Sequence, residues 1–344
     1  MACLFEHVQK DNFSYTYYHL LVKLVIQKAS DFDIWNAVLS LIATSSQATS
    51  PPCPIAFLQQ TPWLCNTNSF HVNTILKEEL GDLHMDISGF LEVYFGNISG
   101  LDLITCVVFN KCKEEDHLLY NEEKGWRDWP EQAMLSESLC ILWRHMITQK
   151  IDWRPLTQST QSLERSIATQ KLDIGFVNDS SATEDSICHW SEILVPGELK
   201  NDPKYYSLSR AWLDLGRYTR EVLAAQNSYC FVLEFTLCRP FLCLWEFDHL
   251  GGIASESFNI NTGLRFISNI LEFLLMSLEQ LGFNLTIITI GGQHYIEIEK
   301  YGGKERLIID DVIRQACCIT GQATTCWKVH HKNDSQTPLV IKNS

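Results

Sequence analysis

Two acidic residues and a lysine have the types and spacing to do chemistry. The apolar run that begins at Ile193 ends in Gly-Glu-Leu-Lys, so Glu198 and Lys200 share one face of a predicted strand. Asp173 lies near the start of the preceding strand-like run, residues 172–177, and a hairpin would bring its carboxylate beside Glu198. Carboxylates are hard oxygen ligands for Mg²⁺, and Lys200 would orient or deprotonate a metal-bound water. The pattern predicts Mg²⁺-dependent phosphodiester hydrolysis, with Lys200 catalytic and the two carboxylates as ligands.

Glu164 adds a third acidic candidate to this set. It lies on a helix expected at residues 157–170, before the strand of Asp173, from which it would supply a further metal ligand. A plainer interpretation competes with this one, because an exposed Glu-x-Lys at a strand end also forms an ordinary surface ion pair of small energy. Both interpretations stay open on the sequence, and nucleic acid is a partner only under the first.

The elements that must position these residues follow an α/β order. A further helix and a strand pair joined by Gly291-Gly292, a hairpin turn signal, complete the unit. This order predicts an α/β unit over residues 154–305, in which helices are expected at 157–170, 205–226 and 264–281 and strands at 172–177, 193–195, 230–238, 241–247, 285–290 and 294–298.

The first 153 residues are predicted to form a mainly helical region. Apolar residues recur at helical spacing in residues 31–42 and 134–150. Residues 44–54 are rich in Pro, Ser and Thr and predict a loop, and the charged residues 111–130 predict a connecting region. Apolar residues return at 76–108 with glycine turn signals between them.

The order of Asp and Glu-x-Lys on successive strands resembles the restriction-endonuclease-like PD-(D/E)XK fold. The resemblance covers about residues 157–247, with Leu172 where the motif's name has Pro. It implies a nuclease-like module that uses Mg²⁺ and acts on nucleic acid.

A second motif lies near the C-terminus. In protein kinases a Gly-rich hairpin covers the ATP phosphates, and a Lys on the following strand contacts the α/β-phosphates. Gly321 matches the first glycine, and the run that ends in Lys342 resembles the V-A-I-K strand, which implies that Gly321, Val329 and Lys342 bind ATP. Ala323 and Cys326 replace the other two glycines, and Val329 falls one residue late for the pattern.

Several unusual strings in one order resemble the fungal-type protein kinase family, from at least Trp35 to the C-terminus. They are residues 189–200, residues 244–249 followed by Gly-Gly, and residues 323–327, with His249 and Gln322 where the family usually has Arg. The resemblance implies a serine/threonine-type protein kinase with ATP and Mg²⁺ as cofactors, and a protein substrate or kinase partner.

The resemblance also implies a third domain, residues 306–344, as the start of a kinase N-lobe. No His-Arg-Asp and no Asp-Phe-Gly occurs in the sequence, so we expect an incomplete kinase domain that is inactive as a kinase in this form. The alternatives are the Mg²⁺-dependent nuclease-like module and a regulatory or binding module for a kinase.

Composition limits the class of protein. The 344 residues carry 41 acidic against 27 basic side chains, a net charge of -14, which argues against a protein that coats nucleic acid by bulk charge. Thirteen cysteines are scattered without a Cys-x-x-Cys pair, the N-terminus lacks a signal-peptide pattern, and the apolar stretch 229–247 contains three charges. An intracellular protein, cytoplasmic or nuclear and without a membrane span, is expected.

Overall fold

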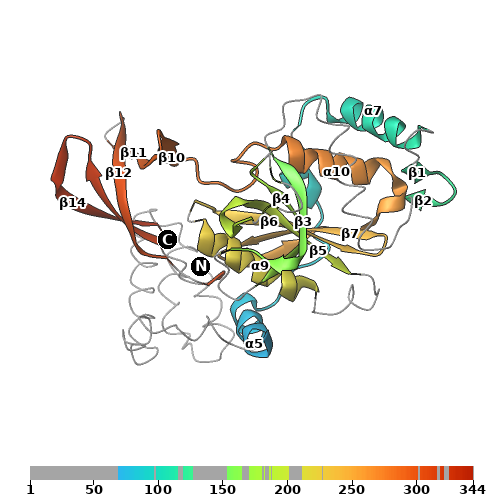
Figure 1. Cartoon of the computed structure of the whole chain (residues 1–344), viewed down its shortest axis with the longest axis horizontal. Helices are drawn as coiled ribbons and strands as arrows, with labels where there is room; N and C mark the ends of the chain where they lie inside the picture. Colours follow the sequence, from blue (N-terminus) through green and yellow to red (C-terminus); the bar gives the residue numbers. More distant parts are fainter. Residues whose placement is uncertain are drawn as a thin grey trace, which may run out of the picture. The chain divides into compact units, whose positions relative to one another are not determined.

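Two large β-sheets organise the chain, as Figure 1 shows for a computed structural model of the protein. Among the described residues, no helix is long and apolar enough to cross a membrane. The helices and the loop predicted at 31–54 and 134–150 lie outside the described residues. The structure describes residues 69–96, 98–114, 119–126, 153–164, 170–179, 182, 186, 188–200, 211–226, 228–300, 303–315, 318–320 and 325–343, which all belong to one unit of the chain, residues 64–344.

The larger sheet has seven strands in the order β3-β4-β5-β6-β7-β8, with β9 paired to β7. Strands β5 and β6 are parallel, and the other described pairs are antiparallel. A parallel pair needs a crossover connection, and helix α9 (Ala211–Ala225) lies between the two strands in the chain. The strands are β3 (Arg154–Ser162), β4 (Lys171–Val177), β5 (Ile193–Lys200), β6 (Phe231–Cys238), β7 (Phe241–Asp248), β8 (Gly251–Ala254) and β9 (Phe258–Asn259).

The helix predicted at residues 157–170 is wrong for its described part, which forms strand β3 and pairs with β4. Thr and Ser dominate this segment, and they are poor helix formers because their side chains compete for backbone hydrogen bonds. The register shifts twice along the pair, after Leu156 and after Gln158. Such bulges break the two-residue alternation that marks a strand, so the sequence lacks the usual strand signal.

Within the region 1–153 that was predicted to be mainly helical, the described residues up to 113 contain three helices, α5, α6 and α7. A short hairpin of β1 and β2 occupies part of the expected connecting region, and the Trp126 indole on it is buried and donates a 3.0 Å hydrogen bond to the Ile260 carbonyl. The remaining elements are α5 (Ser69–Leu80), α6 (Phe90–Tyr94), α7 (Leu101–Lys113), β1 (Tyr120–Asn121), β2 (Gly125–Trp126), the 3₁₀ turns η3 (Trp190–Glu192) and η5 (Ile260–Thr262), and α10 (Leu264–Leu275).

The larger sheet is covered on both faces, and its strands divide their side chains between two cores. Along β6, Leu233 and Phe235 belong to the core shared with α7 and α10, whereas Val232 belongs to the core shared with α5 and α9. On β7, Leu244 and Trp245 divide in the same way. Strands buried on both faces have near-continuous apolar sequences, which is why these two strands were identifiable from the sequence.

The smaller sheet is an antiparallel meander in the order β10-β11-β12-β13-β14. The predicted hairpin at Gly291-Gly292 is confirmed, and both glycines have positive φ angles, 58° and 81°, as a two-residue hairpin loop requires. The domain boundary expected after residue 305 falls inside β12. The strands are β10 (Ile287–Ile290), β11 (Gln293–Lys300), β12 (Gly303–Arg314), β13 (Thr325–His331) and β14 (Asp334–Asn343).

A short segment between β12 and β13 contacts helices α5 and α9, which cover one face of the larger sheet. The Ile319 side chain is fully buried in the core that contains α5 and α9. Its backbone N–H donates to the Glu79 carboxylate, its carbonyl lies 2.8 Å from His249 Nδ1, and the Gln315 amide donates to the Leu223 carbonyl at 2.7 Å. The connection between these strands is therefore anchored by both packing and hydrogen bonds.

Strand β7 buries a carboxyl group, Glu246, which is 6% exposed. Burial and the nearby charge of Asp248 raise the pKa of Glu246 from its usual 4.5 to about 8, against a lowering effect of the hydrogen bond with Tyr94. Glu246 therefore keeps a proton at neutral pH in the folded chain.

We expect this carboxyl to make the protein less stable as pH rises. The unfolded chain releases the proton near pH 4.5 and the folded chain only near 8, so unfolding releases a proton between these values and rising pH favours it. The contribution is about 1.4 kcal/mol per pH unit. Urea unfolding at pH 5, 6, 7 and 8 should give a flatter stability profile for Glu246→Gln than for the wild type. Glu256→Gln, at an exposed position, is the control, and equal slopes in wild type and Glu246→Gln would contradict the expectation.

Candidate functional site

Strands β4 and β5 bring Asp173 and Glu198 together. Ile174 lies opposite Gly197 in the antiparallel register, so Asp173 and Glu198 form the next pair along the two strands. The Leu199 N–H donates a 3.1 Å hydrogen bond to Asp173 Oδ2, and the two carboxyl groups are joined by a side-chain hydrogen bond. The spacing of the sequence predicted this contact between the carboxyls.

Lys200 completes the cluster, together with two residues of α9. Its Nζ forms an ion pair with Glu198 Oε1 and another with Asp214 Oδ2 at 2.9 Å. The Tyr218 hydroxyl donates a 2.6 Å hydrogen bond to Glu198 Oε2. Both oxygens of Glu198 thus have protein partners, and the carboxyl is only 3% exposed. We call these five residues, Asp173, Glu198, Lys200, Asp214 and Tyr218, the carboxyl–lysine cluster.

Burial controls the protonation of this cluster. Desolvation, followed by the charge of Asp173, raises the pKa of Glu198 even though Lys200 opposes the shift, and desolvation also raises the pKa of Asp173. Burial alone would lower the pKa of Lys200, but the charges and hydrogen bonds of Glu198 and Asp214 outweigh it and raise that pKa. The lysine therefore stays charged, while the carboxyl pair tends to retain a proton. Shifted pKa values of this kind gather at functional sites, although buried ion pairs of structural importance produce them too.

The third acidic residue, Glu164, is not brought to the cluster. Its backbone forms an isolated β-bridge with His189, and its Oε2 lies 3.1 Å from His189 Nε2. His189 precedes the start of β5, whereas Glu198 is near the end of that strand. In the described part of the chain, no group of three or more His, Cys, Asp or Glu side chains is arranged to hold a metal ion. Asp173 and Glu198 therefore fit Mg²⁺ only as a two-carboxylate site that waters or phosphate oxygens complete.

Sequence reasoning missed the contribution of α9. Asp214 and Tyr218 are four residues apart and so lie on one face of a helix. The helical spacing of Leu215 and Val222, both fully buried, was the signal that could have placed Tyr218 on the side facing the sheet. The helix was predicted from the sequence without a role in the site, yet Tyr218 and Arg220 are buried, 5% and 8% exposed.

A further carboxyl group, that of Glu234 on β6, lies beside the cluster. It is fully buried, and Thr219 of α9 donates a 2.9 Å hydrogen bond to its Oε1. Burial raises the pKa of Glu234 well above its usual value, and the charge of Glu198 adds to the effect. Its Oε2 has no hydrogen-bond partner among the described residues. Glu234 is therefore a neutral, structurally held carboxyl, and its place within an apolar strand gave no sign of this.

Lys342 lies near the end of β14, beside the first residues of β13. Lys342 lies directly opposite Cys326 in the register, and Gly321 lies outside the described residues. Cross-strand partners share a face of the sheet, so Lys342 lies on the same face as Cys326 and, two residues on, Lys328. Both lysines are exposed. We call the surface formed by Lys328 and Lys342 the lysine face.

Val329, the third implied ATP-binding residue, lies on the other face. It pairs with Leu339, is fully buried, and packs in a small core with Ile296, Leu307 and Trp327. Because neighbouring residues of a strand point to opposite faces, Val329 and Lys342 cannot contact one ligand on the same face. The residue at the pattern's own spacing from Gly321 is Lys328.

Comparison with known proteins bears on the family resemblance. No curated protein and no solved structure matches the chain. A model of a family described as fungal protein kinase matches residues 171–344, which is just over half of the chain and includes both the carboxyl–lysine cluster and the lysine face. The chain therefore belongs to the fungal protein kinase family.

Proposed function

We propose that this chain binds a nucleoside triphosphate on the lysine face of its smaller sheet. The proposal rests on the family membership and on one observation, the register that sets Lys342 opposite Cys326. Since the sequence has no His-Arg-Asp and no Asp-Phe-Gly, we propose binding, and regulation of a kinase partner, and not phosphoryl transfer by these residues themselves.

The lysine face has the charge and spacing that phosphate binding requires. Lys328 pairs with Val340 and Cys326 with Lys342, which makes the two lysines diagonal neighbours, about 7–8 Å apart at the backbone. Two ammonium groups at that separation can contact different oxygens of one polyphosphate. With ATP bound, Mg²⁺ would neutralise part of the phosphate charge. The residues of this chain would hold and orient the phosphates.

Nucleotide binding should depend on Lys342. We expect Lys342→Ala to weaken the binding of a fluorescent ATP analogue at least tenfold in a titration, because it removes one of the two cations of the lysine face; tenfold corresponds to about 1.4 kcal/mol. Lys332→Ala is the matched control, since Lys332 is exposed in the turn at the other end of the same hairpin. Equal losses in both variants, or no binding by the wild type, would overturn the proposal.

A second candidate function, Mg²⁺-dependent cleavage of nucleic acid, is favoured by the contact between Asp173 and Glu198 beside Lys200. Asp173 and Glu198 would hold the cation, which would supply an activated water. Lys200 would have to leave Glu198 to act on that water, since its ammonium group now occupies the place that a cation would take.

Cleavage should be lost when the Glu198 carboxylate is neutralised. Incubation of the purified chain with single- and double-stranded DNA and with RNA, with and without Mg²⁺, should give products that Glu198→Gln reduces at least a hundredfold. Glu164→Gln provides the control, because Glu164 lies outside the cluster. Cleavage that persists in Glu198→Gln comes from another site or from a contaminant, and this candidate function is then wrong.

A further inference from the structure

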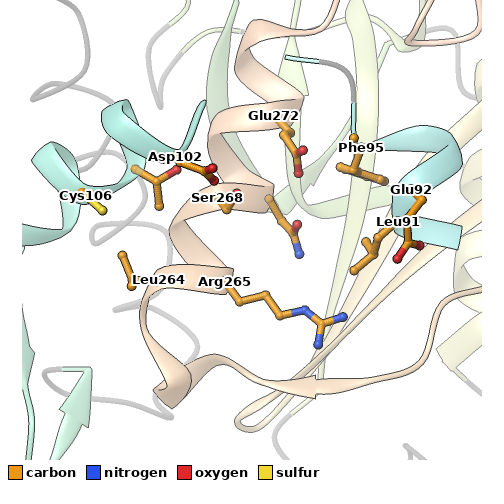
Figure 2. A pocket seen from close by; sticks show the side chains of 12 residues that line it. Leu91, Glu92, Phe95, Asp102, Cys106, Leu264, Arg265, Ser268 and Glu272 are labelled. Atoms are coloured by element: carbon orange, nitrogen blue, oxygen red, sulfur yellow. The ribbon is translucent and has the colours of Figure 1, made fainter. Parts of the chain in front are cut away.

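A cavity of about 510 Å³ lies between helices α6, α7 and α10, on the far side of the larger sheet from α9. Figure 2 shows its lining, with Asp102 and Cys106 from α7, Glu92 from α6, and Arg265 and Glu272 from α10 around one space. This volume is within the range of small-molecule sites. Neither the carboxyl–lysine cluster nor the lysine face contributes to it.

Two buried polar side chains in the lining have unmet hydrogen-bonding capacity. Asn269 is 3% exposed and Thr105 is 4% exposed, and both line the cavity. Asn269 Nδ2 and Thr105 Oγ1 have no hydrogen-bond partner among the described residues. A buried polar atom left unpaired costs about 1–3 kcal/mol, so these two atoms call for a partner that carries an oxygen. The Asn269 amide requires an acceptor, and the Thr105 hydroxyl serves as donor or acceptor.

The cavity also has an excess of acidic groups. Asp102, Glu92 and Glu272 line it, against a single Arg265, and the Arg265 guanidinium lies 4.3 Å from the ring centre of Phe258. Burial, followed by the charge of Asp102, raises the pKa of Glu272 to about 8. A positively charged group between Asp102 and Glu272 would relieve this repulsion and favour the ionised form of Glu272.

Leu91, Phe95 and Leu264 give the lining an apolar wall, and Gly96, Cys106 and Ser268 complete it. Figure 2 shows Phe95 beside Glu272, and Leu264 on the same helix as Arg265. The cavity therefore combines an acidic side, two unpaired polar atoms and an apolar wall, which is the usual composition of a small-molecule site.

From this combination we infer that the cavity binds a small organic cation of the amino-alcohol class. Its ammonium group lies between Asp102 and Glu272, its hydroxyl oxygen meets Asn269 and Thr105, and its apolar body packs on Phe95. The inference does not depend on nucleotide binding or on the carboxyl–lysine cluster.

Cys106 makes binding measurable at this site, because it is an exposed free thiol in the lining. Leucinol, which has an ammonium group, a hydroxyl and a branched apolar body, is the probe. We expect saturating leucinol to slow alkylation of Cys106 by iodoacetamide at least fivefold, as measured by mass spectrometry of the full chain. Cys230, also an exposed thiol but outside the cavity, is the internal control and should not be protected.

Analogues test each part of the ligand. We expect 4-methylpentan-1-ol, which lacks the amine, not to protect Cys106, and isopentylamine, which lacks the hydroxyl, to require at least a tenfold higher concentration than leucinol. Protection by the alcohol equal to that by leucinol would overturn the cationic assignment. Equal potency of the amine and leucinol would overturn the assignment of the hydroxyl to Asn269 and Thr105.

Variants test the protein's side of the contact. Asp102→Asn should weaken protection by leucinol at least tenfold, and Glu114→Gln, which alters an exposed acidic residue at the other end of α7, should leave it unchanged. Asp102 is itself exposed, so its substitution should not unfold the chain, and thermal unfolding of both variants checks this. The inference is wrong if leucinol fails to protect Cys106 in the wild type, if it protects Cys230 equally, or if folded Asp102→Asn is protected as well as the wild type.

Discussion

Replacement of Lys200 by Met is expected to lower the free energy of unfolding by about 3–5 kcal/mol, the usual result of removing one partner from a buried ion pair. The ammonium group of Lys200 contacts Glu198 and Asp214, and the side chain of Asp173 is hydrogen-bonded to that of Glu198. Without the cation, three carboxyl groups remain close together with little water. Urea unfolding at pH 7 measures the loss.

Lys171→Met is the matched control, since Lys171 is exposed at the start of β4 and should change stability by less than about 0.5 kcal/mol. The double variant Lys200→Met/Glu198→Gln should recover part of the loss, because it removes a negative charge together with the positive one. A loss below about 1 kcal/mol for Lys200→Met alone would mean that the cluster is well solvated, contrary to its burial.

Gly197→Val should destabilise the chain by about 3 kcal/mol or more, at the upper end of the range for overpacked cores. A Cβ atom at position 197 would lie 2.3 Å from Phe235 Cζ on the neighbouring parallel strand. Phe235 is 1% exposed and belongs to the core shared with α7 and α10, so its ring has no free space to move into. Because Glu198 is the next residue, relaxation of β5 would also displace the carboxyl–lysine cluster.

The same substitution at Gly303 gives the comparison, because the nearest atom to a Cβ there is 3.8 Å away and the position is an exposed one in β12. The double variant Gly197→Val/Phe235→Leu should be more stable than Gly197→Val if the ring is the obstacle, and a double-mutant cycle gives the coupling energy. Absence of coupling would show that the backbone, and not the ring, excludes a side chain.

The proximity of Asp173, Glu198 and Lys200 was predictable because the geometry of a strand is local. A two-residue period fixes that Glu198 and Lys200 share a face, and two consecutive strands that pair bring Asp173 alongside. The prediction for Glu164 depended on a helix at residues 157–170, whereas the described residues 157–162 of that segment belong to strand β3. Strand β3 is irregular and polar, so neither its type nor its register could be inferred from the spacing of apolar residues.

The contribution of α9 could not be predicted for a different reason. The spacing of Leu215 and Val222 indicates which face of the helix is buried, but which end of which strand that face meets depends on the crossover between β5 and β6, and that is a property of the whole fold. Tyr218 and Glu234 are polar residues in a core, and their burial is tolerable only because Glu198 and Thr219 are in reach. The cavity beside α10 likewise joins residues far apart in the sequence.

The C-terminal sheet shows both outcomes. The hairpin at Gly291-Gly292 follows from glycine's access to positive φ angles. The two-residue period of the strands places Val329 and Lys342 on opposite faces of the sheet. The family resemblance had assigned both residues to one ATP site without considering this period.

The anchored segment between β12 and β13 has a consequence for how the chain folds. The hydrogen bond from Ile319 to Glu79 joins residues 240 positions apart. A ribosome therefore releases α5 long before the residue that fills the space beside it, and no local sequence can close that gap early. Contacts of such long range form at a high entropic cost and slow folding. Among the described residues, the core between α5 and α9 therefore has the longest interval between the synthesis of its first side chain and that of its last.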